Sequence, residues 1–451
     1  MTSDAGFAAV SSRARPITRG QIAAWGLWDW GSAGFNVVIV TFVFSVYLTD
    51  SVGKNLPGSV EAGTWYSFSV AAAGVLIAIT APVSGQQADA GGRRKRSLAV
   101  FTALVFVCML GLFFVRDDYH YFVLGAVLIG LGSVFFEIGT VFYNSMLRQI
   151  STPATIGRVS GFGWSMGYFG GIILLLLAYF GFVDGDGAAR GFLGVSTADG
   201  FNIRMVAVVA AVWFGLSALP VLFAVPELPA GPARERRSFV AAYRKLFADI
   251  AELFRSDRQI ALFLLASAVF RDGLAAIFHF GAILAVLVYG FTPGNVLIFG
   301  AAANIVAALG ALSAGWLDDR WGPKRVVVLS LIGLIVTATV LLFVSGSGAF
   351  WLFGLILTLF VGPAQSASRT FLARMIPPGR EGQIFGLYTT TGRAVSFLAP
   401  ALYGLSAAIF GGQRFGTVGI IVVLVAGLIL LLRVPPPRDT LAAPRVQVPA
   451  L

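Results

Sequence analysis

Residues 315–325 read Gly-Trp-Leu-Asp-Asp-Arg-Trp-Gly-Pro-Lys-Arg, and residues 85–95 read Gly-Gln-Gln-Ala-Asp-Ala-Gly-Gly-Arg-Arg-Lys. Both stretches place a glycine, then an aspartate four residues later, then a second glycine three residues after that, ahead of a basic pair. Each stretch lies between two long apolar runs. Two copies of one motif at equivalent places predict a chain built from two related halves.

Further residues repeat in the same order. Leu147, Pro153, Gly157 and Gly161 recur as Leu372, Pro378, Gly382 and Gly386, and Asp29 and Phe35 recur as Asp272 and Phe278. Three ordered matches indicate an internal duplication, which is typical of transporters made of parallel repeats.

The composition predicts that lipid covers most of the surface. The chain has 451 residues, of which 57% are hydrophobic and 12% charged, and its mean hydropathy is +0.84. Soluble domains carry about 25% charged residues. A spanning helix needs roughly twenty mostly apolar residues. Twelve such runs occur, at about 21–49, 64–84, 98–115, 119–146, 161–183, 203–225, 260–290, 295–314, 326–345, 349–373, 384–410 and 415–433.

The basic residues predict the orientation. The net charge is +11 and the pI about 10.1, but lysine and arginine gather in short loops on one side of the predicted bundle. The loops of the other side hold only Lys54, Arg116, Arg190, Arg204 and Arg414. Basic loops stay inside, so we expect a lipid bilayer rather than nucleic acid as the partner. We place the protein in the cell (inner) membrane, with both termini cytoplasmic.

The predicted organisation has five parts. Residues 1–19 form a cytoplasmic segment, 20–225 the first six-helix half and 260–433 the second half. Between the halves, 226–259 is a cytoplasmic loop with apolar residues at helical spacing, which predicts an amphipathic helix on the inner surface. Residues 434–451 are predicted to be a disordered cytoplasmic tail.

Several residue types are too scarce for other classes of protein. One cysteine and two histidines exclude a disulfide framework and argue against a metal site. No phosphate-binding loop of the ATPase type is present. We therefore expect no cofactor, no metal and no enzymatic activity.

The repeated motif resembles the signature of the major facilitator superfamily, in the loops between spans 2 and 3 and between spans 8 and 9. The resemblance implies the twelve-helix, all-α membrane fold of two pseudo-symmetric halves. The expected gating residues are Gly85, Asp89, Gly92, Gly315, Asp319, Arg320 and Gly322. The glycines would let the chain turn tightly between spans. We predict that Asp89 lies near the inner N-terminus of span 11 and Asp319 near that of span 5, where a carboxylate meets free N–H groups.

A finer resemblance is to the vacuolar-effluxer-like branch of that superfamily. It is carried by Ala24-Trp25-Gly26-Leu27-Trp28-Asp29-Trp30, by Gly157-Arg158-Val159-Ser160-Gly161, by Asp272-Gly273 and by Pro377-Pro378-Gly379-Arg380-Glu381. Fungal members of the branch are linked to amino-acid release from the vacuole, so the resemblance implies efflux of a small solute.

Six charged residues lie within the apolar runs, namely Asp29, Glu137, Arg271, Asp272, Arg369 and Arg393. Each would cost about 2.5–3.5 kcal/mol at the centre of a bilayer, so most must face the protein interior or water. Helical spacing puts Trp25, Asp29, Ser32 and Asn36 on one face, and Ser133, Glu137, Thr140 and Asn144 on another.

These charges supply the candidate site. The substrate-binding candidates are Asp29, Ser32, Asn36, Glu137, Asn144 and Arg393, and the proton-coupling candidates are Asp272 and His279. The alternative is that three acids and three arginines form fixed ion pairs that hold the halves together. Arg369 could also extend to the inner surface.

The sequence therefore predicts a secondary active transporter of a small polar solute, for example an amino acid or similar zwitterion. Alternating access with a coupling ion, most simply a proton, would account for acids inside the spans. One rival is a membrane receptor on the same fold, which a large soluble sensor domain would favour. The other is a lipid-modifying enzyme, which would need a cluster of His, Asp or Ser near one membrane surface.

Overall fold

A computed structural model describes residues 17–437 except 59, 92, 228–254 and 256. Most of the predicted N-terminal segment, amphipathic helix and C-terminal tail lies outside these residues. In the described part, twelve helical spans are long and apolar enough to cross a membrane. They are α1 to η2 (Arg19–Val52), α3 (Ala62–Gly91), α4 (Arg94–Gly111), α5 (Phe122–Ser145), α6 (Ile156–Ala178), α7 (Phe201–Ala224), α9 (Arg258–Leu287), α10 (Pro293–Trp321), α11 (Pro323–Phe343), α12 (Ser347–Met375), α13 (Glu381–Val395) with α14 (Leu398–Phe410), and α15 (Gln413–Leu432).

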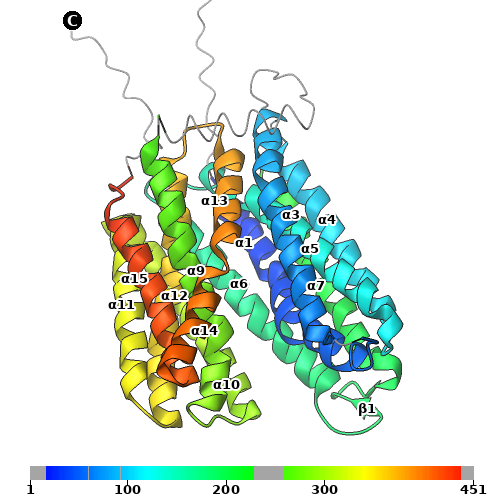
Figure 1. Cartoon of the computed structure of the whole chain (residues 1–451). Helices are drawn as coiled ribbons and strands as arrows, with labels where there is room; N and C mark the ends of the chain where they lie inside the picture. Colours follow the sequence, from blue (N-terminus) through cyan, green and yellow to red (C-terminus); the bar gives the residue numbers. More distant parts are fainter. Residues whose placement is uncertain (1–16, 59, 92, 228–254, 256, 438–451) are drawn as a thin grey trace, which may run out of the picture.

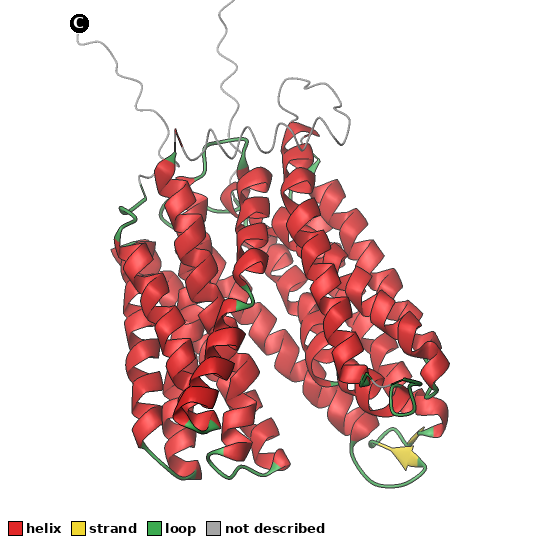
Figure 2. Ribbon diagram, viewed as in Figure 1, coloured by secondary structure: helices red, strands yellow, loops and turns green. Residues whose placement is uncertain are grey.

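The spans form two groups, α1–α7 and α9–α15 (Figure 1). The groups meet near the end of the bundle where α15 ends and diverge toward the opposite end. Figure 2 shows that helices make up nearly all of the described fold, with one small hairpin of β1 (Ala189–Arg190) and β2 (Val195–Ser196) at the diverging end. The predicted all-α fold of two six-helix halves is confirmed.

We call the end where the groups meet the basic end, because it carries the loops after α3, α10 and α12, with Arg93, Lys324 and Arg380. Among the described residues, the hydrogen bonds and ion pairs between the halves lie at this end or in the middle of the spans. The contacts involve α3 with α13, α6 with α10, α6 with α12 and α5 with α13. The structure is thus closed at the basic end.

Three spans are less regular than their apolar runs predict. The fifth ends in a π-helical turn, η6 (Tyr179–Val183). The first contains π-helical turns at η1 (Gly34–Phe42) and η2 (Tyr47–Val52), so its residues beyond Ala33 depart from α-helical spacing. The eleventh is broken at Ser396 and Phe397, between α13 and α14. Pro400 explains the break, because it has no N–H to donate to Ser396 and its ring would clash with that carbonyl in a continuous helix.

Large apolar side chains cover the outer surface of the bundle. Phe223 is 82% exposed and Phe343 81%, while Trp25 and Trp28 are buried within the first half. Isolated apolar side chains are normal on soluble proteins, but an exposed apolar surface of this extent indicates lipid contact.

Candidate functional site

Asp89 connects the first half to the start of span 11. Its Oδ1 accepts the backbone N–H of Gly382 at 2.9 Å, and its Oδ2 accepts that of Gln383 at 2.8 Å. Both N–H groups belong to the first turn of α13, where no intrahelical acceptor is available. The carboxylate also complements the positive end of the helix dipole. The predicted position of Asp89 is confirmed.

A network of charged side chains surrounds this contact. Arg94 lies 2.7 Å from Asp89 and 2.7 Å from Glu381, so it links the two halves. Arg148 of the first half lies 3.5 Å from Glu381 and also donates to the carbonyl of Ile376. All four charged side chains are less than a tenth exposed. We call these four residues the first gate.

Asp319 makes the equivalent contact with span 5. Its two carboxylate oxygens accept the backbone N–H groups of Gly157 at 2.7 Å and Arg158 at 3.1 Å. The side chain of Arg158 donates to Asp319 at 2.9 Å, but this guanidinium is 56% exposed. Arg374, from the same half as Asp319, lies 3.6 Å away. We call Asp319 with Arg158 and Arg374 the second gate, and the predicted position of Asp319 is confirmed.

The motif glycines serve two different purposes, of which we predicted one. Gly322 has φ +84° at the turn between α10 and α11, as expected for a tight turn. Gly85 and Gly315 instead lie inside α3 and α10, where helices of the two halves cross. A Cβ on Gly85 would lie 2.0 Å from the carbonyl oxygen of Gly382, and one on Gly315 would lie 2.7 Å from that of Gly157. The prediction that Gly85 and Gly315 form tight turns is therefore wrong. These two glycines instead allow helices of the two halves to approach closely.

The remaining motif residues contribute less to these contacts. Gly92 lies outside the described residues. Arg320 is exposed at the basic end, with its guanidinium carbon 5.2 Å from the ring centroid of Trp316.

Arg369 connects the halves in the middle of the spans. It extends from α12 into the first half and lies 3.9 Å from Asp29 of α1. It also donates to the side chain of Asn144 at 3.2 Å and to the carbonyl of Ser160 at 2.7 Å. Tyr143 donates to Asp29 at 3.2 Å. The alternative that Arg369 extends to the membrane surface is wrong, because its side chain is only 4% exposed and held by partners in the interior.

Aromatic rings hold this guanidinium in place. Its carbon lies 5.0 Å from the ring centroid of Trp25 and 5.6 Å from that of Trp164. Trp25 stacks on Tyr143 with centroids 4.3 Å apart. Cation–π contacts of a desolvated arginine contribute up to about 2 kcal/mol. The rings therefore offset part of the cost of the charge.

Glu137 and Arg393 form a second ion pair between the halves, from α5 to α13. The Arg393 side chain is 35% exposed and that of Glu137 23% exposed, so this pair is more accessible than the pair of Arg369. Two of the three intramembrane acids therefore have arginine partners in the opposite half. This pairing agrees with the alternative of fixed ion pairs as well as with a transport site. If the halves separate in the middle of the spans, these two ion pairs must break.

Asp272 stays within the second half. Its Oδ2 accepts the backbone N–H of Ala399 at 2.6 Å, at the start of α14, where the break in span 11 leaves N–H groups free. His279 is exposed two turns away on α9 and lies against Phe280. The structure does not bring the two proton-coupling candidates into contact.

The polar candidates near Asp29 do not form a single cluster. The hydroxyl of Ser32 donates to the Asp29 carbonyl at 2.7 Å, which orients it along its own helix. Asn144 accepts from Arg369 and is buried. Asn36 is exposed within η1, where its backbone carbonyl accepts the hydroxyl of Thr41.

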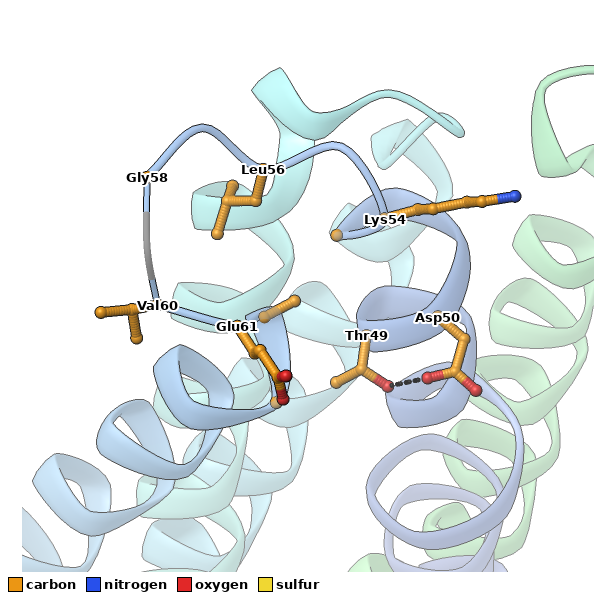
Figure 3. A pocket seen from close by; sticks show the side chains of 10 residues that line it. Thr49, Asp50, Lys54, Leu56, Gly58, Val60 and Glu61 are labelled. Carbon is orange, nitrogen blue, oxygen red and sulfur yellow. Dashed lines mark hydrogen bonds between the residues drawn. The ribbon is translucent and has the colours of Figure 1, made fainter.

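A separate pocket lies at the diverging end, formed by residues 49–63 of the first half (Figure 3). Thr49 donates to Asp50 at 3.0 Å, and Lys54 and Glu61 lie on the same loop. Its lining residues all come from this one segment, so the pocket is not part of the site between the halves.

Sequence reasoning did not assign roles to Glu381, Arg148, Tyr143 or Ser160. Glu381 directly precedes Gly382, the residue that matches Gly157. The available signal was an acidic side chain at the start of a predicted span. Arg148 counted only as a charge for orientation. Tyr143 and Ser160 gave no signal, because single polar residues in spans are most often structural.

Comparisons with known proteins agree with this architecture. A family model described as "Vacuole effluxer Atg22 like" matches residues 51–443. The "Uncharacterized MFS-type transporter YxiO" of Bacillus subtilis (strain 168) is 21% identical over 421 residues, covering 92% of this chain and 95% of that protein. "Autophagy-related protein 22" of Cryptococcus neoformans var. neoformans serotype D (strain B-3501A) is 24% identical over 302 residues. The match covers 62% of this chain and 53% of that relative, so the chain spans about half of the relative's length.

Solved structures share the fold. The proton:xylose symporter XylE matches with a TM-score of 0.72 at 13% identity, over 93% of this chain and 96% of that one. A bacterial homologue of the iron transporter ferroportin, in its outward-facing state, matches with a TM-score of 0.64 at 13% identity, over 92% of this chain and 98% of that one.

The fold and the relatives define a secondary transporter of the major facilitator superfamily, embedded in a membrane by twelve spans. Within that superfamily, the chain belongs to the vacuole effluxer Atg22-like family.

Proposed function

We propose that the chain moves a small zwitterion, such as an amino acid, across the cell membrane by alternating access coupled to a proton. The observation that carries the proposal is that Asp29–Arg369 and Glu137–Arg393 join the two halves in the middle of the spans. Rocking of the halves must break such pairs. A solute with an ammonium and a carboxylate group could supply replacement charges to both halves and so lower the cost of that step.

The orientation follows from the basic loops. The basic end faces the cytoplasm under the positive-inside rule. The contacts of Asp89 and Asp319 hold the halves together at that end, so in this proposal the described state is closed toward the cytoplasm. The family description, vacuole effluxer Atg22 like, supports export as the direction of transport.

Proton coupling falls to Asp272 in this proposal. Its carboxylate is buried and bonded to the start of α14, with no arginine of the described chain within ion-pair distance. A buried carboxyl without a cationic partner is a candidate for proton exchange, because no ion pair holds it in the charged form. Protonation would weaken its bond to Ala399 and loosen the broken span.

The test is transport by the purified protein in liposomes, with a panel of amino acids, sugars and organic ions. Asp29→Asn and Arg393→Gln should each sharply reduce transport, because each leaves one charge of a pair between the halves without its partner. Asp272→Asn should keep exchange of labelled solute and lose accumulation driven by a pH gradient. If Asp29→Asn and Arg393→Gln transport like the wild type, these charges are structural and the zwitterion proposal fails.

A further inference from the structure

Arg271 differs from the other two arginines inside the spans. It lies near the middle of α9, about 20 Å along the helix from Arg258 at 1.5 Å per residue. Arg369 and Arg393 have carboxylate partners, but in the described part of the chain no carboxylate lies within ion-pair distance of Arg271. The adjacent Asp272 bonds to Ala399 instead.

The guanidinium of Arg271 is held in a fixed plane. Its carbon lies 3.9 Å from the ring centroid of Tyr388, and its Nη1 donates to the Tyr388 carbonyl at 3.2 Å. The ring is fixed in turn, because the Tyr388 hydroxyl and the Ser368 hydroxyl share a hydrogen bond of 2.8 Å. A guanidinium has five N–H donors, and the contact with Tyr388 uses one of them.

The guanidinium lies close against α13. Gly392 faces it from α13, and a Cβ at that position would lie 3.3 Å from Nη1 of Arg271. The next residue, Arg393, bonds to Glu137 of the opposite half. Arg271 is therefore a half-buried cation, held on an aromatic ring, beside a point where the two halves meet.

A cation in this position needs a counter-charge. An isolated arginine at the bilayer centre is unfavourable, and the ring recovers only part of that cost. An arginine stacked on a ring with its N–H edge free is preorganised for a planar carboxylate, which it can bind through two parallel hydrogen bonds.

We propose that Arg271 is the residue that binds the carboxylate of the transported solute, held for that purpose on Tyr388. This inference rests on the proposed transport of a zwitterion and assigns its anionic group to Arg271 rather than to Arg369 or Arg393. The ammonium group then faces Glu137, the acid of the neighbouring pair between the halves. One solute would so contact α9 of the second half and α5 of the first.

The test uses the full-length protein in lipid nanodiscs, with the twenty standard amino acids and their carboxamides as probes. Binding is measured as ligand-induced thermal stabilisation, which rises with the ratio of ligand concentration to Kd. At least one free amino acid should stabilise the wild type more than its carboxamide does. Arg271→Gln should weaken binding of that amino acid by at least about tenfold, the loss expected for a charge-assisted pair, and leave binding of the carboxamide unchanged.

Arg414→Gln is the matched control. Arg414 also lies over a tyrosine ring, with its guanidinium carbon 5.5 Å from the centroid of Tyr289, but it donates to Ser345 near the diverging end. This variant should bind the amino acid like the wild type. Arg271→Lys keeps the charge and loses the planar donor pair, so it should also bind at least about threefold more weakly. If Arg271→Gln does not fold, binding by Arg271→Lys serves as the test instead.

Unchanged amino-acid binding by Arg271→Gln, or by Arg271→Lys where the former does not fold, overturns the inference. An equal loss in Arg414→Gln also overturns it, because the effect is then general. If the wild type binds sugars or polyols and no carboxylate, the inference fails while secondary transport stands. If wild-type liposomes exchange no solute at all, the proposed function fails as well.

Discussion

The two gates occupy equivalent places in the two halves, yet they are built differently. Both place an aspartate on the first backbone N–H groups of a span in the other half. The first gate adds a buried acid, Glu381, between Arg94 and Arg148. The offset of the repeat pairs Glu381 with Ile156, so the second gate has no corresponding acid.

The basic residues diverge in the same way. Lys324 occupies the place of Arg94 in the second copy of the motif, but its ammonium donates to the carbonyls of Leu432 and Val434 rather than to Asp319. The charge pair that the second gate forms between halves uses Arg158, which is 56% exposed. The two gates thus share the carboxylate–helix contact. The first gate joins the halves through buried ion pairs, whereas the buried pairs of Arg374 with Asp318 and Asp319 lie within the second half. We infer that the first gate contributes most to closing the basic end.

The largest effect is expected from Asp89→Asn. The change removes one charge from a buried network, and breaking a buried pair in this way costs about 3–5 kcal/mol. Closure of the basic end should weaken, and transport in liposomes should fall to a small fraction of the wild-type rate. Asp186→Asn, in an exposed loop at the diverging end, is the control for the substitution itself. Wild-type transport by Asp89→Asn would show that the first gate is dispensable.

The motif glycines give the next test of the comparison. Gly85→Ala would place a Cβ 2.0 Å from a backbone oxygen of α13, whereas Gly315→Ala leaves 2.7 Å to a backbone oxygen of α6. Since the backbone must move farther in the first case, Gly85→Ala should open the basic end more than Gly315→Ala. Reaction of a single cysteine at the buried Ser151 with an impermeant maleimide, in a Cys108→Ser background, reports the opening. An equal or reversed order would contradict the difference between the gates.

The smallest effect is expected from Asp319→Asn. Asparagine can still accept one backbone N–H, and the lost pair with Arg158 is largely exposed. The buried Arg374 also loses a partner but keeps Asp318 at 3.6 Å, so the cost should be about 1 kcal/mol. Transport should fall by no more than about fivefold. Salt screens exposed charges, so the difference from wild type should shrink between 50 mM and 500 mM potassium chloride. A loss as large as that of Asp89→Asn would mean that both gates carry equal weight.

The sequence predicted the number of spans, the two halves and the contacts of Asp89 and Asp319, because apolar runs and repeated motifs report directly on them. It did not predict the break in span 11, where Pro400 ends the α-helical hydrogen bonding within an uninterrupted apolar run. The π-helical turns of the first span were also missed, since a local change of helical period leaves no trace in hydropathy.

The sequence predicted which charged residues lie between the halves, but only in part how they are paired. Helical spacing correctly indicated that Asp29 and Glu137 face inward, but it could not show which arginine each one meets. Arg369 reaches Asp29 and Arg393 reaches Glu137 through packing between halves that are far apart in sequence. Pairings of this kind depend on how the helices cross, which local patterns do not encode.

The central claim, that the two halves rock between states closed at alternate ends, is tested most directly by paired distance measurements. Spin labels at Arg96→Cys and Arg325→Cys report the basic end, and labels at Phe192→Cys and Ile409→Cys report the diverging end, each pair in a Cys108→Ser background. All four positions are exposed, and each pair joins the two halves. Under substrate and a pH gradient, we expect a second population in which the first distance lengthens and the second shortens. Introducing Asp89→Asn should enrich that population without substrate. Distances that stay fixed under all conditions, or that lengthen together, would contradict the account.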